Sequence, residues 1–250
     1  MVKSADIEAI ERATLAAVSP QAIEELPEGW LLPFDRGTVS RAKTALPLHH
    51  VAPGPELALI ERIEARYRVH GLPPAFRLPD APCFDAMREA LAHRGYGACK
   101  ATVTQVGHAP AMGNLAAGAP AVLDTAPDAG WESVFLGPGF DPVDGASRVR
   151  ALSRASGTLF ASVREDGRTV AAGAIAFGHG WASVHGMRTE QAARGRGLAG
   201  RVLAGLAQAA LARGVERVFL QVEAGNAAAL SLYRRAGFSP AWRYAYWLPA

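Results

Sequence analysis

Residues 187–199, MRTEQAARGRGLA, decide which fold the sequence predicts, because a strand ends here, a glycine-rich loop follows and a helix begins near Ala199. Glycines let successive backbone N–H groups turn toward one concavity, and they let a ligand approach without a Cβ in the way. The helix that follows adds its free N–H groups and the positive end of its dipole. Arg194 and Arg196 add positive charge. The stretch therefore predicts a cradle for a phosphate, and more particularly for a diphosphate.

Two common phosphate-binding loops compete with this interpretation. A P-loop would continue with Gly-Lys-Ser or Gly-Lys-Thr, which the sequence lacks here. Gly195, Gly197 and Gly200 do have the spacing of the dinucleotide-binding fingerprint. That fingerprint also needs an acidic residue at a strand end about 20 residues further on. Only Glu223, after Val222, approaches this role, and spacing alone leaves the alternative open.

Strand and helix patterns alternate on both sides of the loop. Strands are predicted at 121–124, 158–164, 169–177, 181–188 and 217–222, and the tail to residue 248 has the same character. Helices are predicted at 131–136, 147–154, 199–212 and 226–236. Asp166-Gly167 is a hairpin turn, and Gly237 is a natural left-handed end for the last helix. The order predicts a mixed α/β layered fold.

The first half of the chain has a similar order of elements. Helices are predicted at 6–18, at 84–93 and after Pro55, with strands at 30–34, 39–48, 75–78 and 98–106. Residues 107–120, GHAPAMGNLAAGAP, contain Ala, Gly and Pro without periodicity, which is typical of a linker. We therefore expect two domains, at 1–115 and 116–250. Residues 92–106 and 234–248 also resemble each other weakly, each with a basic helix end, a glycine, an aromatic residue and a strand.

The composition excludes several classes of protein. Half of the 250 residues are hydrophobic and a fifth are charged, which is ordinary for a globular protein. No apolar run reaches about 18 residues, and acidic residues stand where a signal peptide needs an apolar core, so we expect neither membrane insertion nor export. Cys83 and Cys99 cannot form a disulfide framework, and no zinc spacing is present, so we predict a cytoplasmic protein without a metal. A net charge of +3 is too small to imply nucleic acid.

Residues 194–199, RGRGLA, resemble the acetyl-CoA motif Gln/Arg-x-x-Gly-x-Gly/Ala of the GCN5-related N-acetyltransferases (GNATs). Further along, Asn226, Tyr233 and the pair Gly237-Phe238 follow in the order typical of that family. The resemblance covers about residues 121–250, and it displaces the dinucleotide interpretation. It implies the acyl-CoA N-acyltransferase fold in two tandem GNAT-like halves, of which the second is complete and the first is a degenerate copy.

The same resemblance implies acetyl-CoA as cosubstrate. The diphosphate would bind the backbone amides of residues 196–200, and the pantetheine arm would pair like an extra strand beside the strand around Met187 and Thr189. The implied cofactor-binding residues are Met187, Arg188, Thr189, Arg194, Gly195, Arg196, Gly197, Leu198, Ala199, Gly200, Asn226 and Tyr233. A plain β-loop-α turn, and for Asn226 a helix cap alone, are the alternatives.

The resemblance also suggests catalytic roles. Tyr233 would be the general acid that protonates the departing CoA thiolate, unless it is a packed core tyrosine. His185 and Glu190 are candidates for the base, and a water chain is an equal alternative. Because residues 116–250 contain no cysteine, we expect direct attack by a primary amine in a ternary complex. The acceptor is expected to be a small molecule; a peptide or protein amine, or a non-catalytic acyl-CoA sensor or scaffold, are the alternatives.

The first half does not repeat the glycine-rich loop. At the corresponding point it reads HHVAPGP over residues 49–55, where Pro53 and Pro55 remove two N–H donors. We expect this half not to bind CoA there, but to shape the acceptor pocket or to pack against the second half, in a monomer or homodimer. His49 and His50 invite a metal interpretation, but no third ligand stands at useful spacing.

Overall fold

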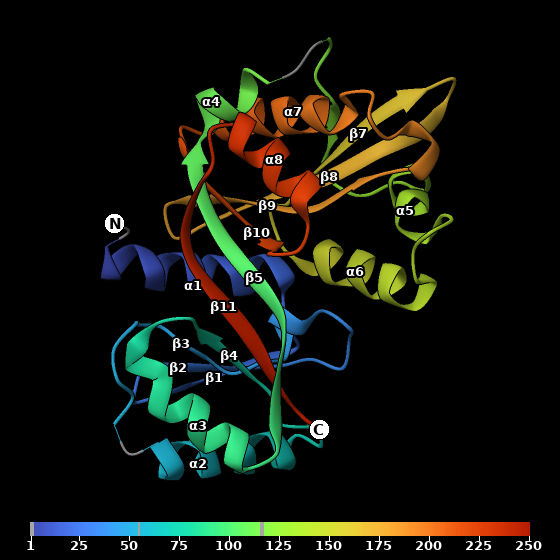
Figure 1. The fold of residues 1–250 in the computed structure, drawn as a ribbon. Coiled ribbons are helices and arrows are strands. Elements are labelled where there is room, and N and C mark those ends of the chain that lie inside the picture. The colour runs from blue at the N-terminus through green and yellow to red at the C-terminus, as the bar shows by residue number, and fades with distance from the viewer. Residues whose placement is uncertain (1–2, 55, 116–117) are drawn as a thin grey trace.

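The structure is a computed structural model that describes residues 3–54, 56–115 and 118–250 (Figure 1). Its centre is an eight-stranded mixed sheet. The strands are β4 (Phe76–Pro79), β5 (Tyr96–His108), β6 (Val122–Asp124), β7 (Leu159–Glu165), β8 (Arg168–Gly178), β9 (Trp181–Thr189), β10 (Arg217–Glu223) and β11 (Ser239–Pro249). They lie in the order β4-β11-β5-β10-β9-β8-β7-β6. Only β9 and β10 among neighbouring strands run parallel.

Helices cover both faces of this sheet. On one face lie α7 (Leu198–Ala212) and α8 (Ala227–Arg235), and on the other lie α1 (Ser4–Val18), α5 (Ala129–Leu136) and α6 (Pro142–Arg154). Side chains alternate between the faces because successive Cβ atoms of a strand point in opposite directions. On β10, Val218 and Leu220 therefore join the core under α7, whereas Phe219 packs against Ile10 of α1.

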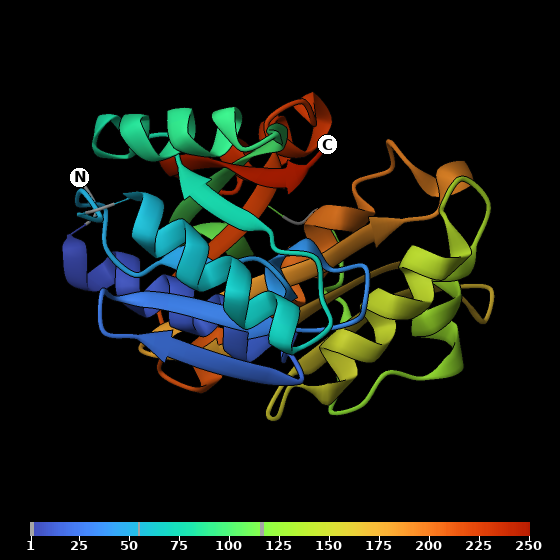
Figure 2. The same cartoon turned by 90° about the horizontal axis from the view of Figure 1, so that it is seen from below.

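The remaining first-half elements form a smaller layer. A three-stranded sheet contains β1 (Ala22–Leu26), β2 (Trp30–Phe34) and β3 (Leu46–Pro47), and beside it lie α2 (Glu56–Val69) and α3 (Asp85–His93). Figure 2 shows α2 lying across β1 and β2, with α5 and α6 side by side further along the molecule. Every residue of β2 is buried, because Trp30 and Leu32 face the cluster of α2 while Leu31 meets Leu15 of α1. The apolar strand 30–34 is thus fully covered.

Strand β5 joins the two parts of the molecule. Its 13 residues lie between β10 and β11, and both pairings are antiparallel. Figure 1 shows β5 and β11 as two long neighbouring strands that run from the α7 side of the molecule to the α3 side. β4 then pairs with the far edge of β11. The division into domains at residues 115 and 116 stays a prediction, but one hydrogen-bonded sheet extends across it.

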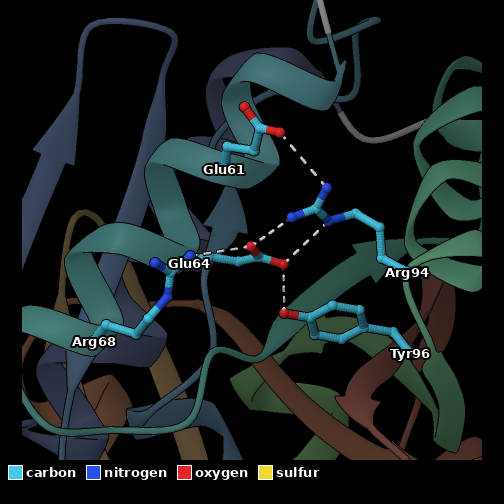
Figure 3. A network of polar contacts seen from close by, with 5 residues as sticks. All are labelled: Glu61, Glu64, Arg68, Arg94 and Tyr96. Atoms are coloured by element: carbon cyan, nitrogen blue, oxygen red, sulfur yellow. Dashed lines mark hydrogen bonds and ion pairs between the residues drawn. The ribbon is translucent and has the colours of Figure 1, made fainter.

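A polar network anchors the start of β5 to α2 (Figure 3). Glu64 of α2 accepts a hydrogen bond at 2.7 Å from Arg94, which follows α3, and another at 3.0 Å from the Tyr96 hydroxyl of β5. Arg68 and Glu61 extend the network on both sides. Glu64 is 7% exposed, so its carboxylate depends on these donors, and they lower its pKa against the effect of burial. The network fixes where β5 begins.

Two predicted elements differ from the structure. The strand expected at 39–48 is a short 3₁₀ turn at Ser40–Ala42 followed by β3, because the Thr44 hydroxyl donates to the Ser40 carbonyl and folds the segment over the sheet. The linker expected at 107–120 begins instead as the end of β5 and continues as α4 (Ala109–Gly113), whose Met112 is fully buried. The small residues of this segment lack helical periodicity in the sequence, but Ala109 and Met112 are buried in the helix. Pro55 and residues 116–117 lie outside the described residues.

Candidate active site

The central feature of the site is a gap between the two parallel strands. β9 and β10 pair at only three positions, which end at Val184 and Leu220. Beyond them β9 continues through His185–Thr189 with β8 on one edge only. The other edge of this segment therefore offers backbone hydrogen-bonding groups that β10 does not use. An extended ligand could pair there as an additional strand.

A bulge shapes the same segment of β9. The register shifts between Ala172 and Ala174 of β8, so that Gly186 and Met187 stand opposite one residue. Gly186 has a φ of +60°, and a Cβ there would lie 2.9 Å from a methyl carbon of Leu152. The position thus requires glycine. A bulge re-aims backbone N–H groups, as a donor to a developing oxyanion would need.

The glycine-rich loop leads directly into α7. Gly195 and Gly197 have φ values of +78° and +76°, and a Cβ on either would meet no atom within 4 Å. Gly197 is the N-terminal cap of α7 and supplies no side chain to cap it. Within the described residues, the N–H groups of Leu198 and Ala199 have no acceptor. Open space in front of free N–H groups is what a phosphate cradle needs, so the residues present fit a CoA diphosphate.

The three predicted arginines lie in different surroundings. Arg188 is largely buried, with its guanidinium 3.9 Å from the centre of the Phe140 ring and 3.6 Å from Asp144. Burial and the nearby Arg148 lower the pKa of Arg188. Arg194 donates to the Thr189 carbonyl at 3.3 Å, and Arg196 pairs with Glu165 at 2.9 Å. Arg188 therefore helps to hold β9, and the two loop arginines stay exposed at the mouth of the cradle.

Asn226 precedes α8 as its N-terminal cap, and Tyr233 lies on α8, the helix that follows β10. The Asn226 side chain accepts from the Ala229 N–H at 3.1 Å, so it caps the helix. Tyr233 is 7% exposed and packs edge-on to Phe238, and burial raises its pKa to about 12. No hydrogen bond from its hydroxyl to a described residue is present. The phenol thus keeps its proton at neutral pH and remains able to donate it.

The two candidate bases lie apart. His185 faces the α1 side of β9, edge-on to Phe219, and its Nε2 atom is buried without a partner among the described residues. Burial, with a smaller effect from Arg41, lowers its pKa to about 3, so the ring stays neutral. Glu190 lies beyond the end of β9, where it pairs with Arg168 and lines a separate cavity of about 360 Å³ with Phe140. Only His185 lines a cavity beside the bulge, one of about 20 Å³.

A further cavity adjoins the small one at His185, and the sequence motifs did not indicate the residues that line it. It measures about 130 Å³ and lies over one face of β10, β5 and β11. Its floor and walls are Lys100, Thr102, Gln221, Glu223, Tyr244 and Tyr246, and its roof is Val39, Ser40, Arg41 and Arg148. Arg41, Val39 and Arg148 line both cavities. Strand alternation could have placed Gln221 and Glu223 on one face, but no sequence signal indicates that residues 39–41 cover them.

Comparison with known proteins identifies the family. The family described as "Probable histone acetyltransferase Rv0428c C-terminal" matches residues 4–247. The chain belongs to this family. No curated protein matches the sequence. The description of this family names an acetyltransferase, and together with GNAT neighbours among solved structures it confirms the GNAT family that the sequence resembles.

Solved structures confirm the mixed α/β GNAT fold. A GCN5-related N-acetyltransferase from Kribbella flavida is 17% identical, with a TM-score of 0.71 over 97% of this chain and 95% of that one. A tandem GNAT protein from the clavulanic acid biosynthesis pathway is 16% identical, with a TM-score of 0.59 over 98% and 94%. A functionally unknown protein from Staphylococcus epidermidis is 12% identical, with a TM-score of 0.70 over 96% and 98%. The degeneracy of the first half stays a prediction.

Within the described residues, no group of three or more His, Cys, Asp or Glu side chains could hold a metal ion. No helix in that part of the chain has the length and apolar character that crossing a membrane would require.

Proposed function

We propose that this GNAT acetyltransferase moves the acetyl group of acetyl-CoA to a primary amine of a small molecule, by direct attack in a ternary complex. The observation that carries the proposal is the separation of β9 from β10 after Val184 and Leu220, directly before a helix whose first N–H groups are free. An extended thioester arm fits the first feature and its diphosphate fits the second. The open edge at residues 185–189 and the free N–H groups of Leu198 and Ala199 lie 9 to 14 residues apart in one chain segment, so one ligand can use both.

Different residues of the chain bind the cosubstrate, polarise its carbonyl and donate the proton. The free backbone N–H groups of Leu198 and Ala199 hold the diphosphate, whereas the predicted donor at Gly200 already donates to the Gly197 carbonyl at 3.0 Å. The β9 edge from His185 to Thr189 holds the arm. Acetyl-CoA supplies an activated acyl group: a C–N bond forms to the amine, the C–S bond breaks, and the thiolate takes a proton. A backbone N–H at the Gly186 bulge polarises the carbonyl. Tyr233, whose pKa is about 12, delivers the proton.

The proton leaving the amine needs an acceptor. Neutral His185 faces the small cavity beside the bulge, and its depressed pKa makes it a weak base that holds a water better than a proton. Glu223 stands at the open end of β10, across the gap from β9. A chain of water molecules from the bulge past His185 to Glu223 would carry the amine proton to the Glu223 carboxylate, and this gives both residues a role. Glu190 pairs with Arg168 in the other cavity and is the weaker candidate.

The family's description favours a second candidate, a protein lysine as acceptor, because it names a histone acetyltransferase. A third possibility is a sensor that binds acyl-CoA without turnover. Thiol release from acetyl-CoA with a panel of small amines and one histone-tail peptide separates them, set beside CoA affinity from calorimetry. We expect turnover with a small amine. Turnover with the peptide alone would reassign the acceptor, and CoA binding without any turnover would identify a sensor.

A further inference from the structure

The cavity over β10, β5 and β11 has an unusual distribution of charge. Arg41, Lys100 and Arg148 supply three cations, and Glu223 supplies one carboxylate. Arg148 is neutralised by Asp144 at 2.6 Å. Among the described residues, no carboxylate lies within 4.0 Å of Arg41 or Lys100, and no cation lies within that distance of Glu223. Opposite charges thus face one cavity without pairing with each other.

The Arg41 side chain is held in place by a chain of hydrogen bonds. Arg41 donates from Nη1 to the Gln221 side chain at 3.1 Å, and Gln221 in turn donates to Thr14 of α1 at 3.4 Å. The Nε atom of Arg41 is buried and has no partner in the described part of the chain. A buried N–H without an acceptor costs about 1–3 kcal/mol, so a ligand that supplies an acceptor gains at this position.

Lys100 reaches the cavity through strained backbone. It has a φ of +49° within β5, a left-handed conformation that residues other than glycine rarely adopt. The strain coincides with a bulge, where the pairing shifts between Tyr244 and Tyr246 of β11. The Thr102 hydroxyl donates to the Lys100 carbonyl at 2.8 Å and stabilises the turn. Strain of this kind persists where the surroundings enforce it, typically at functional sites.

The two tyrosines complete the wall. Their hydroxyl oxygens lie 3.4 Å apart, and the guanidinium of the fully buried Arg77 lies 5.0 Å from the centre of the Tyr244 ring. Burial raises the pKa of Tyr246 well above its usual value, so its hydroxyl stays a donor. Hydroxyl donors beside free guanidinium and ammonium groups are suited to a carboxylate, whereas they repel a second cation.

From these observations we propose that the acceptor is a small zwitterion, an amine that also carries a carboxylate, such as an amino acid. Its carboxylate binds Arg41 and Lys100, and its amine lies beside Glu223 at the open end of the strand pair. The cavity of about 130 Å³ matches a molecule of this size. Because Glu223 stands at the open end of β10, across the gap from the β9 edge that holds the thioester arm in the proposed function, the bound amine is close to the reacting carbonyl. This assignment of the substrate class rests on the proposed function.

The test compares zwitterions with amines that lack the carboxylate. The probes are the proteinogenic amino acids, β-alanine and γ-aminobutyrate, each set against its carboxamide, with acetyl-CoA at saturation. We expect kcat/KM at least 10-fold higher for one or more acids than for the matched amides, mostly through KM. Arg41→Gln should lower the ratio of kcat/KM for acid over amide to about 1. Arg150→Gln on the exposed face of α6, a charge change outside both cavities, should leave it unchanged.

A binding measurement separates this inference from the proposed function. Calorimetry of the same acid and amide pairs, with the protein saturated with CoA, does not require turnover. If no amine is acetylated but the acids bind better than the amides and Arg41→Gln removes the difference, the proposed function fails and the cavity assignment stands. Equal binding and equal kcat/KM for acids and amides, or efficient turnover only of polyamines or lysine-rich peptides, would overturn the assignment.

Discussion

Replacement of Gly197 by valine tests the cradle at its most sensitive position. Gly197 has φ +76° and ψ +2°, a Cβ there would meet no atom within 4 Å, and the residue directly precedes the free N–H groups of Leu198 and Ala199, so we expect a larger side chain to occupy the space that the phosphate needs. Hydrogen bonds to a charged group contribute about 1.5–3 kcal/mol each. Losing two of them removes about 3–6 kcal/mol, so CoA affinity should fall by at least about 100-fold.

The same substitution also carries a conformational cost that must be separated from binding. An L-residue in the left-handed region costs about 1–2 kcal/mol. For a protein of this length each kcal/mol lowers Tm by about 2–4 °C. Gly214→Val is the matched control, because Gly214 follows the other end of α7 with φ +67° and equally open space around its Cβ.

Calorimetric titration with CoA and a thermal melt of both variants decide the question. We expect similar losses of Tm for Gly197→Val and Gly214→Val, but a loss of CoA affinity for Gly197→Val alone. Normal CoA affinity in Gly197→Val would refute the cradle. Equal loss of affinity in both variants would show that general destabilisation, rather than the blocked N–H groups, explains the effect.

Further predictions concern catalysis, pH and the first half. Tyr233→Phe should keep CoA affinity and lower turnover by about 10²–10⁴ in single-turnover kinetics, and an unchanged rate would make Tyr233 a packing residue. His185 has its folded pKa lowered to about 3 from an ordinary value of 6.5, so the unfolded state binds the extra proton and stability should fall as pH drops from about 6.5 toward 3. Urea titrations should show this slope reduced by up to about 1.4 kcal/mol per pH unit in His185→Asn; an identical slope would contradict burial of the ring. Residues 116–250 expressed alone should be poorly soluble or weakly active, because β5 is then missing between β10 and β11, while the intact chain should melt in one step. A soluble, fully active fragment would show that the first half is an independent module.

The sequence predicted those parts of the fold that local chemistry determines. The helix after the glycine-rich loop, the cap at Asn226 and the apolar strand 30–34 each follow from residues next to one another in the chain. It did not predict that β5 inserts between β10 and β11, because such pairing depends on contacts more than 100 residues apart.

In the candidate site, too, the sequence predicted local features but not contacts between distant segments. The motif predicted the cradle and the strand before it, where the relevant groups are backbone N–H groups of consecutive residues. The cavity that we propose for the acceptor depends instead on Arg41 from a 3₁₀ turn, Lys100 from a bulge and Glu223 from a distant strand end. Their approach is a product of tertiary folding. The strand predicted at 39–48 would not cover the cavity. Residues 40–42 form its roof only because they turn over the sheet rather than extend along it.

Hydrogen exchange with and without acetyl-CoA tests the central claim most directly, namely that one cofactor site is built by the open edge of β9 and the start of α7. Peptide-level exchange reports protection of backbone amides wherever the ligand occupies them. We predict slowed exchange at residues 185–189 and 195–200, and no change at residues 49–54, which the sequence predicts to be the corresponding loop of the first half. Protection at residues 49–54, or no protection at 185–200 with acetyl-CoA at saturation, would contradict the account.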